Sequence, residues 1–175
     1  DWSSDVCSSD LRFHIKTPIF VAREWFRHRI GSFNEFSMRY AIPDIDFYIP
    51  DVEYFRTQVG KPGAYTFEPM DNEQGEVGYL QRQMQESCSI AAQTYQQLIE
   101  NGVAKELARV VLPVNTYTEF YWSVNARAIL NFISLRNAPE AMREIRDFAE
   151  AVEYIFSNCM PYTYESFIKN NRVAV

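Results

Sequence analysis

A dense group of cationic and polar residues lies between positions 27 and 40, where the sequence is RHRIGSFNEFSMRY. Arg27 and Arg29 flank His28. Seven residues separate Arg29 from Ser37, and one residue separates Ser37 from Arg39. Guanidinium groups form paired hydrogen bonds with phosphate and carboxylate groups, so arginine suits anionic ligands. Compensation of a helix dipole would explain arginines at a helix end, but not the polar loop after them. We therefore expect this segment to bind an anion.

Arginine dominates the basic residues of the whole chain, accounting for 13 of 17. Three of these arginines interrupt apolar stretches: Arg109 in LARVVLP, Arg127 in VNARAIL and Arg136 at the end of NFISLR. A buried arginine without a partner is too costly to persist, so each of them requires an anionic group. An internal salt bridge would satisfy any single one. Three such arginines, together with the group near position 27, favour an anionic ligand.

A polar stripe is expected on the helix predicted over residues 125–136. Arg127, Asn131 and Ser134 recur at spacings of four and three, whereas most positions between them are apolar. The stripe could simply face solvent. An exposed helix face is usually rich in lysine and glutamate, however, and arginine with asparagine suits directional hydrogen bonds to a planar ligand.

The elements that must position these residues can be predicted from periodicity and from breaker residues. We expect strands at residues 12–16, 46–49 and 116–124, and a polar loop and an irregular segment at residues 32–40 and 50–72. Helices are expected at residues 18–29, 73–101, 104–111, 125–136, 139–158 and 162–169. This pattern predicts an α+β fold, a helix-dominated single domain with a small antiparallel sheet.

Composition narrows the class of protein. The chain has 175 residues, a formal charge of −6 and 47% hydrophobic residues, which suits one folded domain and excludes a disordered tail. The acidic balance argues against bulk nucleic-acid binding, and no apolar run is long enough to span a membrane. Three scattered cysteines indicate neither a metal motif nor a disulfide framework, so we expect a cytoplasmic protein, with Cys88 and Cys159 in its core.

The first eleven residues, DWSSDVCSSDL, differ from the rest of the chain. They hold two Ser-Ser pairs and three aspartates without helical or strand periodicity. The segment resembles the translation of a sequencing-library adapter, and a disordered native terminus is the alternative. We therefore expect residues 1–11 to be non-native and the native domain to occupy residues 12–175.

Residues 27–37 resemble the RHR-x7-S signature of the flavin-dependent thymidylate synthases. Three further blocks match this family in the same order: PIFVAREWFRHR (18–29), LARVVLPVN (107–115) and FYWSVNARAILNFISLR (120–136). The resemblance implies the thymidylate synthase-complementing protein fold and the conversion of dUMP to dTMP. Methylenetetrahydrofolate would supply the carbon, and NADPH would reduce the FAD that delivers hydride. The family forms homotetramers with sites shared between subunits.

The resemblance also implies roles for individual residues. No metal ligands are implied, and Arg136 would be catalytic, favouring ionisation of the uracil ring. The residues implied in FAD binding are Arg27, His28, Arg29, Glu35, Asn125, Arg127 and Asn131. Those implied in dUMP binding are Glu24, Arg27, Glu35, Ser37, Arg39, Arg109 and Arg136.

One departure from the family leaves an alternative open. The family carries a further N-terminal part with an H-x-[ST]-P-x-E-H-like segment that helps to hold FAD, and residues 1–11 stand in its place here. The domain is therefore expected to lack its N-terminal part. A catalytically inactive fragment or homologue, which only binds nucleotide or flavin or oligomerises, is the alternative to an active enzyme.

Overall fold

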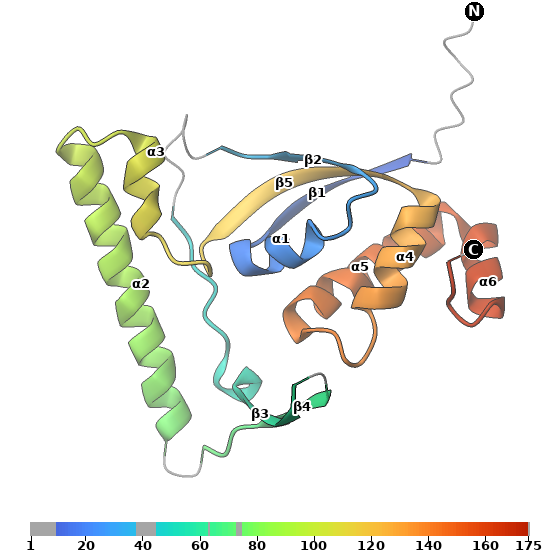
Figure 1. The fold of residues 1–175 in the computed structure, drawn as a ribbon, viewed down its shortest axis with the longest axis horizontal. Helices are drawn as coiled ribbons and strands as arrows, with labels where there is room; N and C mark the ends of the chain where they lie inside the picture. The colour runs from blue at the N-terminus through green and yellow to red at the C-terminus, as the bar shows by residue number, and fades with distance from the viewer. Residues whose placement is uncertain (1–9, 38–44, 63, 73–74, 175) are drawn as a thin grey trace, which may run out of the picture. The chain divides into compact units, whose positions relative to one another are not determined.

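Alternating apolar residues build a three-stranded sheet in the computed structural model, which describes residues 10–37, 45–62, 64–72 and 75–174 (Figure 1). The strand order is β1–β5–β2, with β1 at Asp10–Pro18, β5 at Tyr117–Asn125 and β2 at Ser32–Glu35. Strand β2 pairs antiparallel with β5, in a register that runs from Ser32 opposite Ser123 to Glu35 opposite Phe120.

The described chain divides into two compact units. The first contains the residues up to Phe36 and those from Thr118 onward, and therefore nearly all of this sheet. The second is Ser37–Tyr117.

One face of the sheet forms the core of the first unit. Successive side chains of a strand point to opposite faces, so Phe13 and Ile15 of β1 and Trp122 of β5 are buried, whereas Tyr121 is exposed. Helices α1 (Ile19–Trp25), α4 (Ala126–Arg136), α5 (Arg143–Cys159) and α6 (Pro161–Lys169) complete this unit, and α4 packs along α5 (Figure 1).

Trp25, the last residue of α1, is fully buried in this core. Its ring stacks on Phe132 of α4 at a centroid distance of 4.6 Å and meets Trp122 of β5 edge to face at 5.4 Å. Aromatic pairs in these geometries stabilise a core beyond the area they bury, by roughly 0.5–1.5 kcal/mol each. The ring thus joins the end of α1, the sheet and the middle of α4.

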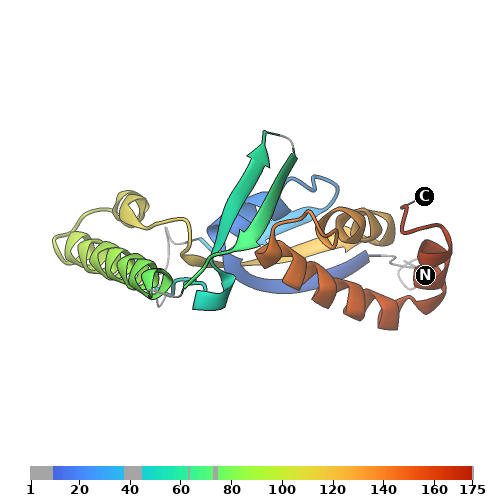
Figure 2. The same ribbon diagram turned by 90° about the horizontal axis from the view of Figure 1, so that it is seen from below.

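The second unit contains a long helix and a hairpin. Helix α2 (Glu76–Glu100) is followed by Gly102 in a left-handed conformation, then by α3 (Lys105–Ala108) and the short helix η2 (Arg109–Val111). Another short helix, η1 (Val52–Tyr54), precedes the hairpin of β3 (Arg56–Lys61) and β4 (Ala64–Pro69), drawn in green in Figure 2.

The structure confirms the predicted α+β class, dominated by helices and with a small antiparallel sheet. All the predicted helices form, although the first ends four residues earlier and the fifth begins four residues later than expected. No helix in the described ranges is long and apolar enough to cross a membrane.

Four local predictions were wrong. Residues 32–35, expected in a loop, form β2 because their backbone pairs with β5, whereas residues 46–49 contribute only an isolated bridge at Phe47. The expected irregular segment contains the β3–β4 hairpin, because Pro62 falls at its turn and Pro69 at a strand end, where neither interrupts pairing. Cys88 is buried as expected, but Cys159 is exposed at the end of α5.

Candidate functional site

A cavity of about 780 Å³ opens in the first unit, a volume within the usual range for small-molecule and cofactor sites. Its walls come from the segment after α1, from one side of α4 and from the C-terminal tail. The lining residues are Arg27, His28, Arg29, Ile30, Asn125, Arg127, Ala128, Asn131, Leu135, Arg136 and Ala174. The cavity therefore brings together seven of the residues predicted for the site.

The segment after α1 is held in a tight turn against the sheet. The backbone N–H groups of Phe26 and His28 donate to Ala22 and Trp25, and the chain then turns at Gly31, whose φ is 149°. A Cβ atom at Gly31 would lie 2.9 Å from Nε1 of Trp122, so only glycine allows this close approach. The arginines of this segment therefore project from a turn that is anchored on the core.

Helix α4 presents its polar side to the cavity. Asn125 is the N-cap, and its side-chain oxygen accepts a hydrogen bond of 2.9 Å from the N–H of Ala128. Arg127 and Asn131 follow on one face at a spacing of four residues, whereas Phe132 points into the core. Two of the three positions of the predicted polar stripe thus line the cavity, whereas Ser134 is not a lining residue.

Arg136, the last residue of α4, is the centre of the most connected group of the site. Its Nε donates to Nε2 of His28 at 2.9 Å, and its Nη1 donates to Oε1 of Glu24 at 3.0 Å. Its Nη2 has only a long contact of 3.5 Å with the backbone carbonyl of Glu24. The guanidinium plane is therefore fixed by two partners, while Nη2 remains the nitrogen best able to donate to a ligand.

His28 is neutral at physiological pH. Burial, and next the positive charge of Arg136, lower the pKa of His28 from 6.5 to about 4. Because Nε2 accepts from Arg136, the proton of the neutral ring resides on Nδ1. The ring packs edge to face on Phe132 at a centroid distance of 4.9 Å. The histidine thus orients Arg136 without adding a charge.

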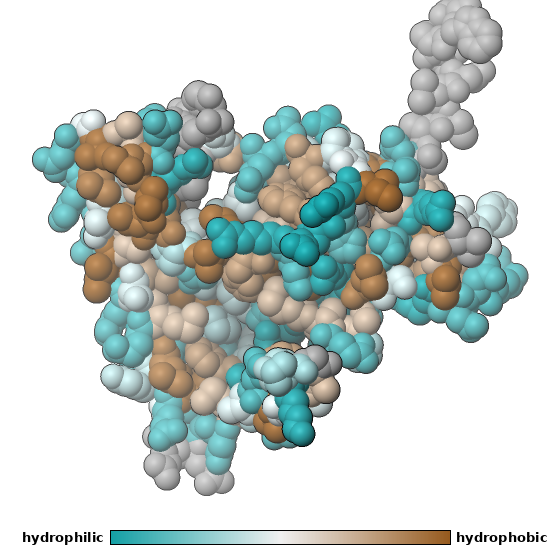
Figure 3. Space-filling model, in the orientation of Figure 1, coloured by the Kyte–Doolittle hydropathy of each residue, from teal (hydrophilic) through white to brown (hydrophobic). Residues whose placement is uncertain are grey.

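The cavity carries an excess of positive charge. Four arginines line it, and none of the lining residues in the described ranges is acidic. Arg27, Arg29 and Arg127 are exposed and have no carboxylate partner within the part of the chain that the structure describes. Figure 3 shows strongly hydrophilic surface over α1, in the orientation of Figure 1. A site of this kind attracts an anionic ligand.

Glu24 contributes an acceptor that is not satisfied. Its Oε1 accepts from Arg136, but its Oε2 is buried without a hydrogen-bond partner among the described residues. Glu24 does not itself line the cavity, but Arg136, which donates to its Oε1, does.

Glu35, Ser37 and Arg109 are not among the residues that line the cavity. Glu35 lies in β2, where its Oε1 accepts a hydrogen bond of 2.7 Å from Thr118. Ser37 and Arg109 belong to the second unit, where the exposed Arg109 donates from Nε to the carbonyl of Glu106 at 3.3 Å. Arg39 lies outside the described residues. The cavity itself thus contains neither Ser37 nor Arg109 among its lining residues.

Ala174 is the lining residue that sequence reasoning could not have found. It follows Arg136 by 38 positions, is small and apolar, and belongs to no motif. Ile30 and Leu135, which also line the cavity, are adjacent to predicted site residues and could have been included on that basis.

The sequence matches the family described as thymidylate synthase complementing protein over residues 7–162. The chain belongs to this family. The family match begins inside the segment expected to be non-native, and strand β1 begins at Asp10, so the boundary at residue 11 stays a prediction.

Relatives in this family are called flavin-dependent thymidylate synthase. The one from Thermosipho melanesiensis is 44% identical over 159 residues, which are 91% of this chain and 68% of the relative. The one from Tropheryma whipplei strain TW08/27 is 43% identical over 173 residues, 95% of this chain and 71% of the relative. The chain thus spans roughly two thirds of the length of these curated members of the thymidylate synthase complementing protein family.

A solved structure supports the same membership. The UMP/dUMP methylase PolB from Streptomyces cacaoi, bound with 5-Br UMP, superposes with a TM-score of 0.88 at 37% sequence identity. The superposition covers 95% of this chain and 75% of PolB. The family fold therefore extends through both units described above.

Proposed function

We propose that this chain catalyses the reductive methylation of dUMP to dTMP with a bound flavin. The single observation that carries the proposal is the cavity in which Arg27, Arg29, Arg127 and Arg136 converge without an acidic lining residue in the described ranges. Such a cavity suits a ligand that carries phosphate groups, and both a dinucleotide cofactor and a nucleotide substrate carry them. Membership of the family and the names of its relatives support the choice of ligands.

The residues present fit an FAD molecule. The volume is adequate, exposed guanidinium groups can hold its phosphates, and Asn125 and Asn131 offer amide groups for directional hydrogen bonds. A bound flavin would supply the hydride-transfer chemistry that protein side chains lack. The residues that we propose for FAD are Arg27, His28, Arg29, Glu35, Asn125, Arg127 and Asn131.

For dUMP, we propose that Arg136 acts on the uracil ring. Its guanidinium is oriented by His28 and Glu24, so no reorganisation is needed when Nη2 donates to a ring oxygen that gains negative charge. The unpaired Oε2 of Glu24 can accept from an N–H or O–H of the nucleotide. The residues that we propose for dUMP are Glu24, Arg27, Glu35, Ser37, Arg39, Arg109 and Arg136.

Several further elements of the proposal rest on the family resemblance. They are methylenetetrahydrofolate as the carbon donor, NADPH as the reductant, a homotetramer with shared sites and a cytoplasmic location. We also propose residues 12–175 as the native part of the domain. An inactive homologue that binds flavin without turnover is the competing function.

The direct test is to purify the chain, titrate it with FAD, and measure dTMP formation from dUMP with NADPH and methylenetetrahydrofolate. Saturable FAD binding with NADPH-dependent dTMP formation is the expected result. FAD binding without turnover would favour the inactive homologue. A chain that binds neither FAD nor dUMP would refute the proposal.

A matched pair of variants locates the site. Arg27→Gln removes an exposed guanidinium from the cavity, and Arg23→Gln removes an exposed one from α1 that does not line it. Because a charge-assisted hydrogen bond contributes about 1.5–3 kcal/mol, Arg27→Gln should raise the Kd for FAD about tenfold or more. Arg23→Gln should leave it unchanged. Equal effects of the two variants would show that only overall charge matters.

A further inference from the structure

Within the described ranges, Glu153 is the one carboxylate among the buried residues. It lies on α5 in a stripe of buried residues that includes Ala149, Val152 and Phe156. Only 8% of its surface is exposed. A carboxylate in such a position is tolerated only if several donors satisfy it.

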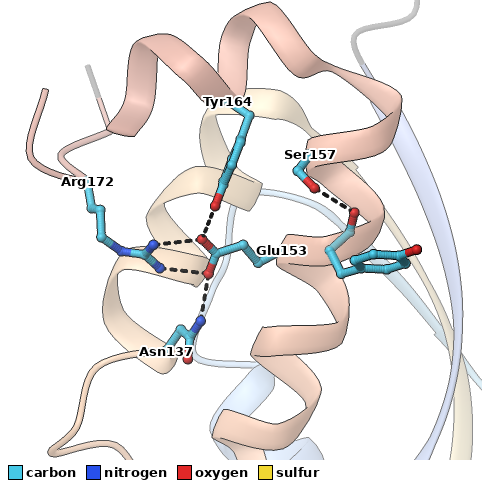
Figure 4. A network of polar contacts seen from close by, with 6 residues as sticks. Asn137, Glu153, Ser157, Tyr164 and Arg172 are labelled. Atoms are coloured by element: carbon cyan, nitrogen blue, oxygen red, sulfur yellow. Dashed lines mark hydrogen bonds and ion pairs between the residues drawn. The ribbon is translucent and has the colours of Figure 1, made fainter. Parts of the chain in front are cut away.

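Three residues from three parts of the chain supply those donors (Figure 4). Arg172 binds both carboxylate oxygens of Glu153, with two distances of 2.7 Å. Tyr164 of α6 donates from its hydroxyl to Oε1 at 2.7 Å, and Asn137 donates from Nδ2 to Oε2 at 2.6 Å. Burial alone would raise the pKa of Glu153, but these hydrogen bonds, with Arg172 first, hold it below its usual value.

Asn137 connects this group of residues to the cavity through α4. Asn137 is the C-cap of α4, and its backbone N–H donates to Ile133. It directly follows Arg136, whose guanidinium is oriented by hydrogen bonds to Glu24 and His28. Fixing the side chain of Asn137 therefore fixes where α4 ends and where the stem of Arg136 begins.

The second connection runs through the tail. Asn171 and Arg172 have φ values of 55° and 61°, and a left-handed conformation costs a residue with a side chain about 1 kcal/mol or more. This pair reverses the chain after α6, with the N–H of Arg172 donating to Phe167. Ala174, two residues further, then lies in the cavity wall. The bidentate bond from Arg172 to Glu153 opposes the tendency of this strained turn to open.

We propose that Glu153 is a positioning residue that clamps two parts of the cavity wall in place, the end of α4 at Arg136 and the tail at Ala174, for binding of the flavin and the nucleotide. The ligand assignment in this inference rests on the proposed function; the clamp itself does not. Glu153 lines no part of the cavity, so it acts through Arg172 and Asn137.

The test uses Glu153→Gln, which keeps the shape of the side chain and removes its charge. Ala174→Cys is introduced as a reporter, and its reaction with a thiol reagent is followed by mass spectrometry of the labelled peptide, so that the other cysteines do not interfere. Without the clamp, the tail should open more often. Since a hydrogen bond to a charged group contributes about 1.5–3 kcal/mol, labelling at position 174 should accelerate about tenfold or more.

Two control variants separate positioning from general loosening. Val152→Ala truncates a buried neighbour on α5 and should lower Tm without changing the labelling rate at position 174. Lys169→Gln breaks an exposed pair with Glu165 on α6 and should change neither quantity. The same labelling rate in Glu153→Gln as in the parent, or equal acceleration in Val152→Ala, would overturn the clamp.

FAD titration connects the clamp to the cavity. FAD should slow labelling at position 174, and Glu153→Gln should raise the Kd for FAD about tenfold while Val152→Ala leaves it near the parent value. If FAD binds but neither protects position 174 nor binds more weakly to Glu153→Gln, the wall role is refuted and the proposed function stands. If the parent binds no FAD, the proposed function fails, and labelling without ligand still decides whether Glu153 holds the tail.

Discussion

Replacing Arg136 with lysine tests whether the shape of this side chain matters as much as its charge. The guanidinium donates simultaneously to His28 and Glu24, while its Nη2 has a long contact of 3.5 Å with the backbone carbonyl of Glu24. Lysine ends in one ammonium group and lacks the planar fork. It can pair with the Glu24 carboxylate, but it cannot also reproduce the contact of Nε with His28 and the second donor at the position of Nη2.

The expected loss follows from these contacts. At least one charge-assisted hydrogen bond is missing in Arg136→Lys, which corresponds to about 1.5–3 kcal/mol. If that bond forms to the reacting ring in the transition state, turnover falls about 10- to 100-fold. The Kd for FAD should stay within about threefold, because three other arginines line the cavity and the positive charge is retained.

The assay is steady-state dTMP formation together with an FAD titration, on the same preparation. Arg143→Lys is the matched control, because Arg143 is an arginine at the start of α5 that pairs with Asp147 at 4.0 Å and lines no part of the cavity. That control should turn over like the parent. Parent-like turnover in Arg136→Lys would remove Arg136 from the catalytic role, and loss of FAD binding would mean that the residue acts on the cofactor instead.

Three further predictions concern the walls of the cavity. Because the folded state keeps the pKa of His28 near 4 and the unfolded chain titrates near 6.5, the contribution of His28 to stability should be constant well above pH 6.5 and fall as the pH drops toward 4. Urea unfolding should show a decrease of up to about 2 kcal/mol between pH 7 and 5 that is absent in His28→Gln. Gly31→Ala should lower the free energy of unfolding by about 1–3 kcal/mol, since its Cβ would meet Trp122, and should weaken FAD binding in a titration. Asn125→Ala should destabilise by about 1 kcal/mol through loss of the α4 cap, whereas Asn125→Asp should keep the cap and Tm but weaken FAD binding through its negative charge; no change in FAD affinity in Asn125→Asp would contradict the anionic-ligand assignment.

Local chemistry made much of the cavity predictable from the sequence. Arg127 and Asn131 could be assigned to one face of the helix because helical spacing is regular. Arg136 was expected to need an anionic partner, and it pairs with Glu24, which was itself among the predicted site residues. In these cases a short-range rule was enough.

Long-range features were not predictable in this way. Strand β2 has no alternating pattern of strong strand-forming residues. It forms because its backbone pairs with β5, and the local sequence does not indicate this pairing. Glu153 occupied an ordinary position in a charged helix, and its four hydrogen bonds depend on residues 11 to 19 positions away. The role of Ala174 depends on a reversal of the chain at two residues that are not glycine.

Helix α4 carries the cavity on one side and the core on the other, with Asn131 and Phe132 as adjacent residues. The helix therefore cannot unwind without dismantling both. A ligand that binds only when α4 is folded must then raise the free energy of local unfolding of α4 by RT ln(1 + [L]/Kd). This increase is about 2.7 kcal/mol when the ligand concentration is a hundred times Kd. Amide hydrogen exchange in the middle of α4 should slow accordingly, so that the backbone of one helix becomes a gauge of occupancy even for ligands that have no colour and undergo no reaction.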